Sequence, residues 1–282
     1  MRTVLLSMVL AALACGTRPQ APTASPGPPL DPNPGEAWQA PAAGALVWVP
    51  GATVAMGAPD HEPGRGPNEG PVHEVTVEGL WVLRAEVSQG LYERVMGERP
   101  SGFAGCLDCP VDQVSWFDAV AFANALSEME GLSPAYSGGD PTVSWDRSAD
   151  GYRLLTEAEW EHAARGGQPF RHAGSNDPTA IGWVRANEGE HPHPSCEKPP
   201  NGFGLCDLTG NLREWVWDWA APYGEGPQSN PTGPAEGHYR GIRGGSWWAE
   251  PWQARVAYRF SQPPRYRSMS LGIRLGRPAS GR

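Results

Sequence analysis

The hydrophobic residues of this chain occur in short, separated groups, and few of these groups keep a regular period. Residues 46–49 and 54–57 are mainly apolar and flank a Pro-Gly pair, which predicts two short strands joined by a turn. Residues 73–77 alternate between polar and apolar side chains, as a half-buried strand does. Near the end of the chain, strands are expected at 247–248, 256–258 and 271–273.

Helix signals occur at three places. A helix is predicted over 88–97, and a second helix is expected to begin after the capping residue Ser115. A third is predicted over 156–166, because Thr156 and Glu159 have the spacing of a capping box. Few helices, many short strands and long loops together indicate an α+β domain with little regular secondary structure.

The composition agrees with a loop-rich domain. The 282 residues include 36 Gly, 31 Pro and 13 Trp, so aromatic side chains are expected to carry much of the packing. The net charge of −9 argues against a nucleic-acid partner, for which a basic face is the usual footprint.

The first residues have the pattern of an export signal. Residues 1–14 combine Arg2 with an apolar run that is too short to span a bilayer. The run ends in Ala-Leu-Ala before Cys15, which resembles a bacterial lipobox. We therefore expect a signal peptide over 1–14, lipidation of Cys15 and anchoring to the cell envelope, at the outer membrane in a Gram-negative host. Ordinary secretion with Cys15 removed is the alternative.

The segment 15–44 is rich in Pro and Ala and poor in large apolar residues. Such a composition cannot bury enough surface to fold, so we interpret it as an extended tether.

Four further cysteines are present, at Cys106, Cys109, Cys196 and Cys206. An even number in an exported chain favours disulfides, and the two local pairs are 106–109 and 196–206, although three connectivities are possible. Zinc is the competing interpretation. The wide spacing of the second pair and the oxidising compartment make it less favoured.

Several motifs spread over about residues 45–276 point to one family. They are Trp48-Val49-Pro50-Gly51, Pro110-Val111, Val114-Ser115-Trp116, the segments 152–161 and 200–205, Gly210-Asn211, Glu214-Trp215 and Arg243-Gly244-Gly245-Ser246-Trp247. In order and spacing they resemble the formylglycine-generating-enzyme family, also called sulfatase-modifying factors. The resemblance implies a single domain, assigned to 45–282, with a variant C-type-lectin fold.

The resemblance also defines what is missing. Founding members of the family oxidise a cysteine of a sulfatase to formylglycine with copper and oxygen, using two cysteines shortly after Gly-Gly-Ser. Here no cysteine follows Cys206, and Ala249 and Ala254 are among the residues after that motif. Soft thiolates are what Cu(I) requires. Copper is therefore not expected, and no catalytic residue is assigned.

Calcium is the cofactor that the resemblance still implies. The implied ligands are the carboxylates of Asp207 and Glu214 and the carbonyl oxygens of Gly210 and Leu212. Hard oxygen ligands of this kind suit calcium. The alternative is a turn held by Asp and Asn side chains bonded to backbone amides.

A second calcium site of the family would begin at Asn187 and Glu188, although its distal ligands cannot be assigned in this sequence. His191 and His193 nearby are interpreted as part of an exposed loop, because a metal site would need further ligands.

The family's substrate groove corresponds to an aromatic segment with interspersed arginines. The predicted ligand-binding residues are Trp248, Trp252, Arg255 and Arg259, since Arg stacks on rings and clasps carboxylates. Trp247 is expected in the core and Trp248 or Trp252 at the surface. The alternative is that most of these side chains are core.

Two functions remain open. The first is a lipoprotein with a non-catalytic binding or scaffold domain, whose ligand is an unknown peptide, protein or small molecule. The second is a divergent oxidoreductase that acts on a peptide or secondary metabolite without the cysteine pair. A bound redox metal would favour the second, and calcium alone would favour the first.

Overall fold

The computed structural model describes residues 27–29, 31–187 and 189–279. The expected signal peptide and Cys15 therefore lie outside the described residues, as does part of the expected tether. No helix in the described part of the chain is both long enough and apolar enough to cross a bilayer.

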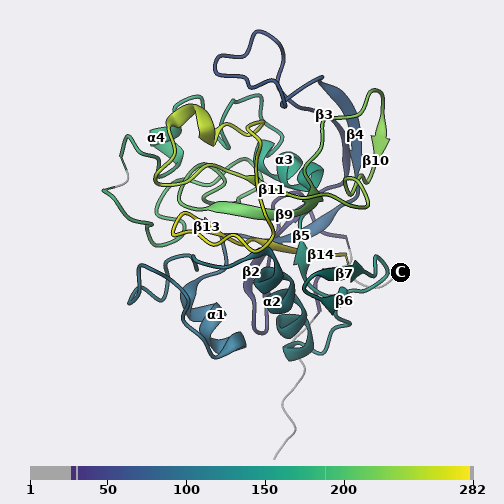
Figure 1. The fold of residues 1–282 in the computed structure, drawn as a ribbon, viewed down its shortest axis with the longest axis vertical. Helices are drawn as coiled ribbons and strands as arrows, with labels where there is room; N and C mark the ends of the chain where they lie inside the picture. Colours follow the sequence, from purple (N-terminus) through teal and green to yellow (C-terminus); the bar gives the residue numbers. More distant parts are fainter. Residues whose placement is uncertain (1–26, 30, 188, 280–282) are drawn as a thin grey trace, which may run out of the picture.

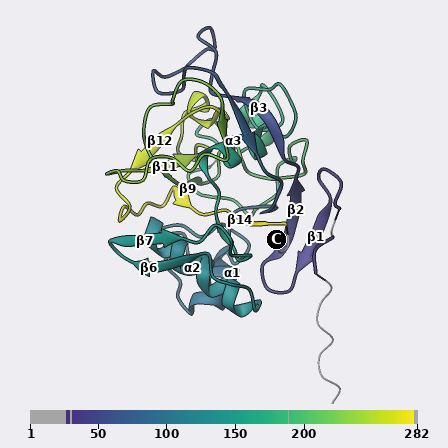
Figure 2. The ribbon, with the colours of Figure 1, turned by 90° about the vertical axis from the view of Figure 1, so that its right-hand side faces the viewer.

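The largest sheet is antiparallel and joins the two ends of the domain (Figures 1 and 2). Its strands, in spatial order, are β1 (Ala37–Ala40), β2 (Gly44–Val49), β5 (Leu80–Leu83), β14 (Leu275–Pro278) and β8 (Arg153–Leu154). Strand β14, from the end of the chain, therefore pairs on both sides with earlier strands.

A second sheet carries the segment on which the sequence analysis placed the ligand groove. Its strands, in spatial order, are β12 (Phe260–Gln262), β11 (Arg240–Arg243), β9 (Arg213–Trp219) and β13 (Leu271–Gly272). A three-stranded sheet contains β10 (Gln228–Ser229), β4 (His73–Val77) and β3 (Ala52–Met56), and β6 (Tyr136–Gly139) and β7 (Thr142–Trp145) form a hairpin. The predicted strands at 46–49, 54–57 and 73–77 are confirmed, with bounds that differ slightly for the first two.

The helices begin where the capping signals predict. They are α1 (Gln89–Met96), α2 (Trp116–Met129), α3 (Glu157–Arg165) and the short α4 (Pro178–Ile181), with a 3-10 turn at Pro251–Ala254. Ser88, Ser115 and Thr156 each accept a backbone N–H of the first turn through the side chain. The α+β class is confirmed.

The expected domain boundary at residue 45 is wrong. Strand β1 pairs with β2 within the expected tether, and Trp38 packs against Trp81 with ring centroids 6.0 Å apart. The ordered domain thus begins before residue 37, because Trp38 and Ala40 give this Pro-rich stretch enough apolar surface to join the sheet.

Two strand predictions near the end of the chain are also wrong, because residues 247–248 and 256–257 form turns and residue 258 belongs to no strand. The guanidinium of Arg243 donates hydrogen bonds to the carbonyl oxygens of residues 256, 257 and 258. These carbonyls are therefore committed to a side chain and do not enter a sheet. The predicted strand at 271–273 is present in part, as β13.

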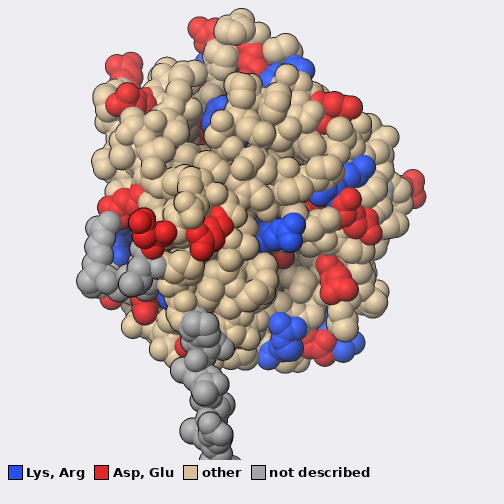
Figure 3. All heavy atoms as spheres, turned by 180° about the vertical axis from the view of Figure 1, so that it is seen from behind, with Lys and Arg blue, Asp and Glu red and all other residues tan. Residues whose placement is uncertain are grey.

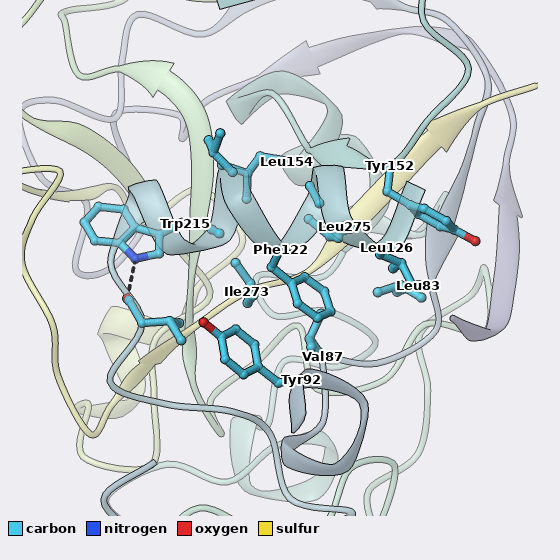
Figure 4. Packing of buried hydrophobic residues seen from close by; sticks show 14 of the residues in the cluster. Leu83, Val87, Tyr92, Phe122, Leu126, Tyr152, Leu154, Trp215, Ile273 and Leu275 are labelled. Carbon is cyan, nitrogen blue, oxygen red and sulfur yellow. Dashed lines mark hydrogen bonds between the residues drawn. The ribbon is translucent and has the colours of Figure 1, made fainter. Parts of the chain in front are cut away.

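The main hydrophobic cluster holds α1 and α2 against the sheets (Figure 4). Tyr92 of α1 stacks on Phe122 of α2 with ring centroids 5.2 Å apart. Trp215 of β9 donates its indole N–H to the Val114 carbonyl at 3.0 Å, and Leu275 of β14 lies in the same cluster. Each large apolar side chain buried in this way contributes about 1.5–3 kcal/mol. The cluster thereby fixes β9, the strand beside the candidate site.

Buried ion pairs tie distant segments together. Five buried arginines each face a glutamate at 2.5–2.8 Å, in the pairs Arg153–Glu159, Arg243–Glu161, Arg255–Glu69, Arg259–Glu157 and Arg274–Glu214. Three of these glutamates come from α3, which packs against β3, β4, β9 and β11. Because a buried charge is costly unless it is paired, the pairs fix which segments can adjoin α3.

Candidate functional site

The segment after Gly-Gly-Ser divides its tryptophans between core and surface. Trp247 is 7% exposed and donates its indole N–H to the Met269 carbonyl at 3.1 Å. Trp248 and Trp252 are 52% and 48% exposed. The prediction that Trp247 is in the core and that Trp248 or Trp252 is at the surface is confirmed, and both of the latter are exposed.

The two exposed rings, which we call the tryptophan surface, are held by their neighbours. Trp252 meets Tyr258 edge-on at 5.5 Å, and the guanidinium carbon of Arg185 lies 4.9 Å from the centroid of the Trp248 ring. Trp252 also lines an open hollow of about 610 Å³ together with Arg171 and residues 63–65. The arrangement can offer flat apolar anchors beside a concave surface. On the face seen in Figure 3, the coloured Lys and Arg side chains lie singly among Asp and Glu.

The prediction that Arg255 and Arg259 clasp a ligand is not supported by their contacts. Arg255 donates to both carboxylate oxygens of Glu69, at 2.7 and 2.8 Å, and to Glu62 at 2.6 Å. Arg259 donates to both oxygens of Glu157, at 2.7 and 2.6 Å. Both arginines are buried and satisfied within the fold. Their role is to hold the loop around residue 69 and the start of α3.

The segment after Gly-Gly-Ser, which contains no cysteine, is tightly packed at its two alanines. Ala249 and Ala254 are fully buried. A Cβ added to Gly245, whose φ is +73°, would lie 2.7 Å from the Cβ of Ala254, so the backbone there requires glycine. Both predicted disulfides, Cys106–Cys109 and Cys196–Cys206, are confirmed. The four cysteines of the described region are thus all oxidised.

Asp207, the first expected calcium ligand, is buried with one oxygen unused. Its Oδ2 accepts the backbone N–H of Cys196 at 2.7 Å, and its Oδ1 has no hydrogen-bond partner among the described residues. Burial, with a further contribution from the charge of Glu214, raises the pKa of Asp207 to about 6. The sulfurs of Cys196 and Cys206 lie close to this carboxylate, but they are bonded to each other and offer no thiolate.

Glu214, the second expected carboxylate ligand, is engaged elsewhere. Both of its oxygens accept hydrogen bonds from the guanidinium of Arg274, and Oε2 also accepts the indole N–H of Trp160 at 2.6 Å. Glu214 is therefore the counterion of Arg274 in this structure, which departs from the expected ligand set. An ion at Asp207 would have to share Glu214 with Arg274.

A third carboxylate, which the sequence analysis missed, adjoins this region. Glu86 is buried and accepts the backbone N–H of Leu212 at 2.9 Å and the side-chain amide of Asn211 at 3.0 Å. Burial raises the pKa of Glu86 well above its usual value, and the charges of Asp207 and Glu214 raise it further. Three acidic groups thus surround one arginine, so the electrostatics suit a cation. The free oxygen of Asp207 is the group that fits one.

At the second expected calcium site, the side chain of Asn187 is engaged with the backbone of its own loop. Asn187 accepts the backbone N–H of Val184 through Oδ1 at 2.9 Å and donates from Nδ2 to two backbone carbonyls. The side chain of Asn187 thus stabilises the loop after α4 through these hydrogen bonds. Glu188 lies outside the described residues. His191 is exposed, whereas His193 is partly covered and stacks on Trp183 with ring centroids 3.7 Å apart.

Comparisons with known proteins agree with this architecture. Residues 33–279 match the family described as the sulfatase-modifying factor enzyme 1-like domain. The chaperone protein LppX of Paenibacillus barcinonensis is 34% identical over 233 residues, which cover 70% of this chain and 78% of that protein. A formylglycine-generating enzyme of Streptomyces coelicolor is 36% identical over 208 residues, covering 67% of this chain and 58% of the enzyme.

Solved structures resemble the whole domain. Treponema denticola variable protein 1 superposes with a TM-score of 0.77 at 30% identity, over 83% of this chain and 94% of that one. PvdO of Pseudomonas aeruginosa superposes with a TM-score of 0.73 at 26% identity, over 88% of this chain and 100% of that one. These likenesses agree with the fold that the sequence motifs implied, a variant of the C-type-lectin fold.

Proposed function

Because the chain belongs to the sulfatase-modifying factor enzyme 1-like family, we propose that it is an exported lipoprotein whose domain binds a protein or peptide without forming formylglycine. The observation that carries this proposal is the pair of buried alanines, Ala249 and Ala254, in the segment after Gly-Gly-Ser. Methyl groups cannot coordinate Cu(I) or capture a substrate thiol. Both disulfides occupy other parts of the fold, which leaves the segment without sulfur.

The tryptophan surface supports a binding role. Exposed Trp side chains are costly in water and are frequent as binding anchors in protein interfaces. Trp248 and Trp252 are held by Arg185 and Tyr258, so little side-chain freedom would be lost on binding. A protein partner also agrees with the relative whose name is that of a chaperone. Trp248 and Trp252 are the residues proposed to contact the partner.

The lipid anchor is the proposed means of localisation. Its support is the Ala-Leu-Ala-Cys sequence ending at Cys15, and two disulfides agree with an oxidising compartment. In cells that express the chain, Cys15→Ser should move it from the membrane fraction to the soluble fraction or leave it unprocessed. A wild-type chain that is already soluble and begins beyond residue 15 would refute the anchor.

Calcium is the proposed structural ion. Asp207 would supply one carboxylate oxygen, and the carbonyls of Gly210 and Leu212 are the further ligands that the family resemblance implies. The positive charge of the ion would offset the excess of acidic groups, since Glu86, Asp207 and Glu214 adjoin one arginine, Arg274. Binding of the ion would also stiffen the loop that leads into β9.

The binding role can be tested with a permanently unfolded probe, reduced and carboxymethylated α-lactalbumin carrying a fluorescent label. We expect the wild-type chain to raise the anisotropy of the probe saturably. The double variant Trp248→Ser/Trp252→Ser should weaken binding by about tenfold or more, as the loss of interface anchors does. Met129→Ser, which removes an exposed hydrophobic side chain at the end of α2, is the matched control. Equal affinity of the double variant and the wild type would refute the surface.

A further inference from the structure

A second hollow, separate from the tryptophan surface, lies between the β6–β7 hairpin and one end of β9. Its volume is about 590 Å³, within the usual range of small-molecule sites. Trp145, Trp217 and Trp219 form its aromatic walls, Arg147 and the loop 232–237 lie along it, and Arg240 of β11 is among its lining residues. None of these residues lines the hollow beside Trp252.

Arg240 is held between two indole rings. Its guanidinium carbon lies 3.7 Å from the ring centroid of Trp116 and 3.5 Å from that of Trp219. Nη1 donates a hydrogen bond to the Trp217 carbonyl. Nε is buried and has no partner within the described ranges. The rings orient the guanidinium but cannot neutralise its charge.

Arg240 differs from the five buried arginines that pair with glutamate. It is 4% exposed, and among the described residues it forms no ion pair. Burial lowers the pKa of Arg240 to about 9, so the unpaired charge is itself costly. Arg277 is likewise buried and forms no ion pair within the described part of the chain, but it packs on Trp38 and Tyr152 and does not line this hollow.

We propose that the hollow between Trp145, Trp219 and Arg240 binds a small organic carboxylate with a flat face. The carboxylate supplies the counterion that Arg240 lacks among the described residues, and the flat face of the ligand stacks on the indole walls. Guanidinium groups match the planar geometry of a carboxylate, and π-faces favour flat partners. This site lies beyond the proposed protein-binding role, and neither depends on the other.

A single negative charge suits the hollow better than a phosphate dianion. The charged residues that line it are Arg147, Arg240 and Glu236, so two positive charges face one negative charge and a single carboxylate balances the difference. The second charge of a phosphate would have no counterion among these residues and would be repelled by Glu236. The geometry thus favours an aromatic acid or an acidic sugar, and it predicts that the neutral analogue of either ligand binds poorly.

The test is ligand-observed NMR and calorimetry on the mature chain with four probes: indole-3-acetate, glucuronate and their neutral counterparts indole-3-acetamide and glucose. We expect at least one acid to bind with a Kd of about 1 mM or tighter and its neutral counterpart to bind about tenfold more weakly. Arg240→Gln and Trp145→Leu should each weaken the acid by about tenfold. Arg99→Gln, at an exposed arginine on another surface, should leave binding unchanged. Which acid binds distinguishes a sugar ligand from an aromatic one.

Several results would overturn the proposal. They are failure of both acids to bind, equal binding of an acid and its neutral counterpart, or tighter binding of inorganic phosphate than of either acid. Undiminished acid binding by a folded Arg240→Gln variant would also overturn it. If that variant does not fold, Trp145→Leu decides, because Trp145 is on the edge hairpin and only partly buried.

Discussion

Glu69 and Arg255 form a bidentate ion pair in the interior, with hydrogen bonds of 2.7 and 2.8 Å across 186 residues of sequence. The pair joins the long loop before β4 to the segment that carries Trp252. Arg255 also donates to Glu62 and to the Gly64 carbonyl, so the loop is held at three residues beside the tryptophan surface. A residue interpreted from sequence as ligand-binding thus positions the surface instead.

Removing one partner of this pair should destabilise the fold strongly. Glu69→Ala leaves the buried Arg255 with Glu62 as its one carboxylate partner among the described residues, and breaking a buried pair in this way costs about 3–5 kcal/mol. Urea unfolding measures the loss. Glu93→Gln breaks the exposed pair with Arg99 and should cost about 1 kcal/mol or less. Similar losses in the two variants would contradict the structural role of Glu69.

The Cys196–Cys206 disulfide should stabilise the domain by restricting the unfolded chain. It closes a loop with a sequence separation of 10. Replacing both cysteines by Ala should lower the free energy of unfolding by about 2–3 kcal/mol in the chain-entropy model. Thiol titration of the denatured, unreduced wild type should detect none of the four cysteines. Four titratable thiols would show that neither disulfide forms.

Asp218 should make stability depend on pH. Burial and the charge of Glu157 raise its pKa to about 8, whereas an unfolded Asp titrates near about 4. Between these values the folded chain keeps a proton that the unfolded chain has released, so stability should fall as the pH rises. The slope for this one proton is at most about 1.4 kcal/mol per pH unit.

Asp218→Asn isolates this contribution, because the amide oxygen can still accept the backbone N–H of Glu157. Urea unfolding of the variant between pH 5 and 8, about the window set by the two pKa values, should show a shallower decline than the wild type. If the free energy of unfolding fell equally steeply with pH in the variant and the wild type, Asp218 would be ionised in the folded state.

The sequence predicts local features well and distant partners poorly. Ser115 and Thr156 start helices through bonds to residues three positions away, so capping patterns locate α2 and α3. The glutamate partner of Arg259 lies 102 residues away, and no local pattern indicates it. Likewise the mistaken strand at 256–258 reflects Arg243, whose side chain captures carbonyls that an apolar pattern would assign to a sheet.

Part of the site has a local signal in the sequence. Trp215, Trp217 and Trp219 alternate along the chain, which is the period of a strand with two differently buried faces. That pattern predicts the strand β9, which carries two of the indole walls of the Arg240 hollow, Trp217 and Trp219. The approach of Trp116 and Trp219 to Arg240 depends on tertiary packing between α2 and the second sheet, which no local pattern specifies.

Calcium should stabilise the native domain because Asp207 and its neighbours come together only in the fold. A ligand at 100 times its Kd adds roughly 2.7 kcal/mol. Chelation should therefore lower the melting temperature, and Asp207→Ala should remove that sensitivity. Asp60→Ala, at an exposed aspartate, is the control. A melting temperature that chelator leaves unchanged, in protein shown by elemental analysis to have lost its metal, would refute the site.

The central claim is that the domain binds without generating formylglycine. The most direct measurement is mass spectrometry of a sulfatase-type Cys-x-Pro-x-Arg peptide after incubation with the purified protein, copper and oxygen. Because Ala249 and Ala254 supply no thiolate, the account predicts a peptide mass identical to that of the no-protein control. A protein-dependent mass loss that matches replacement of the cysteine thiol by an aldehyde would contradict it.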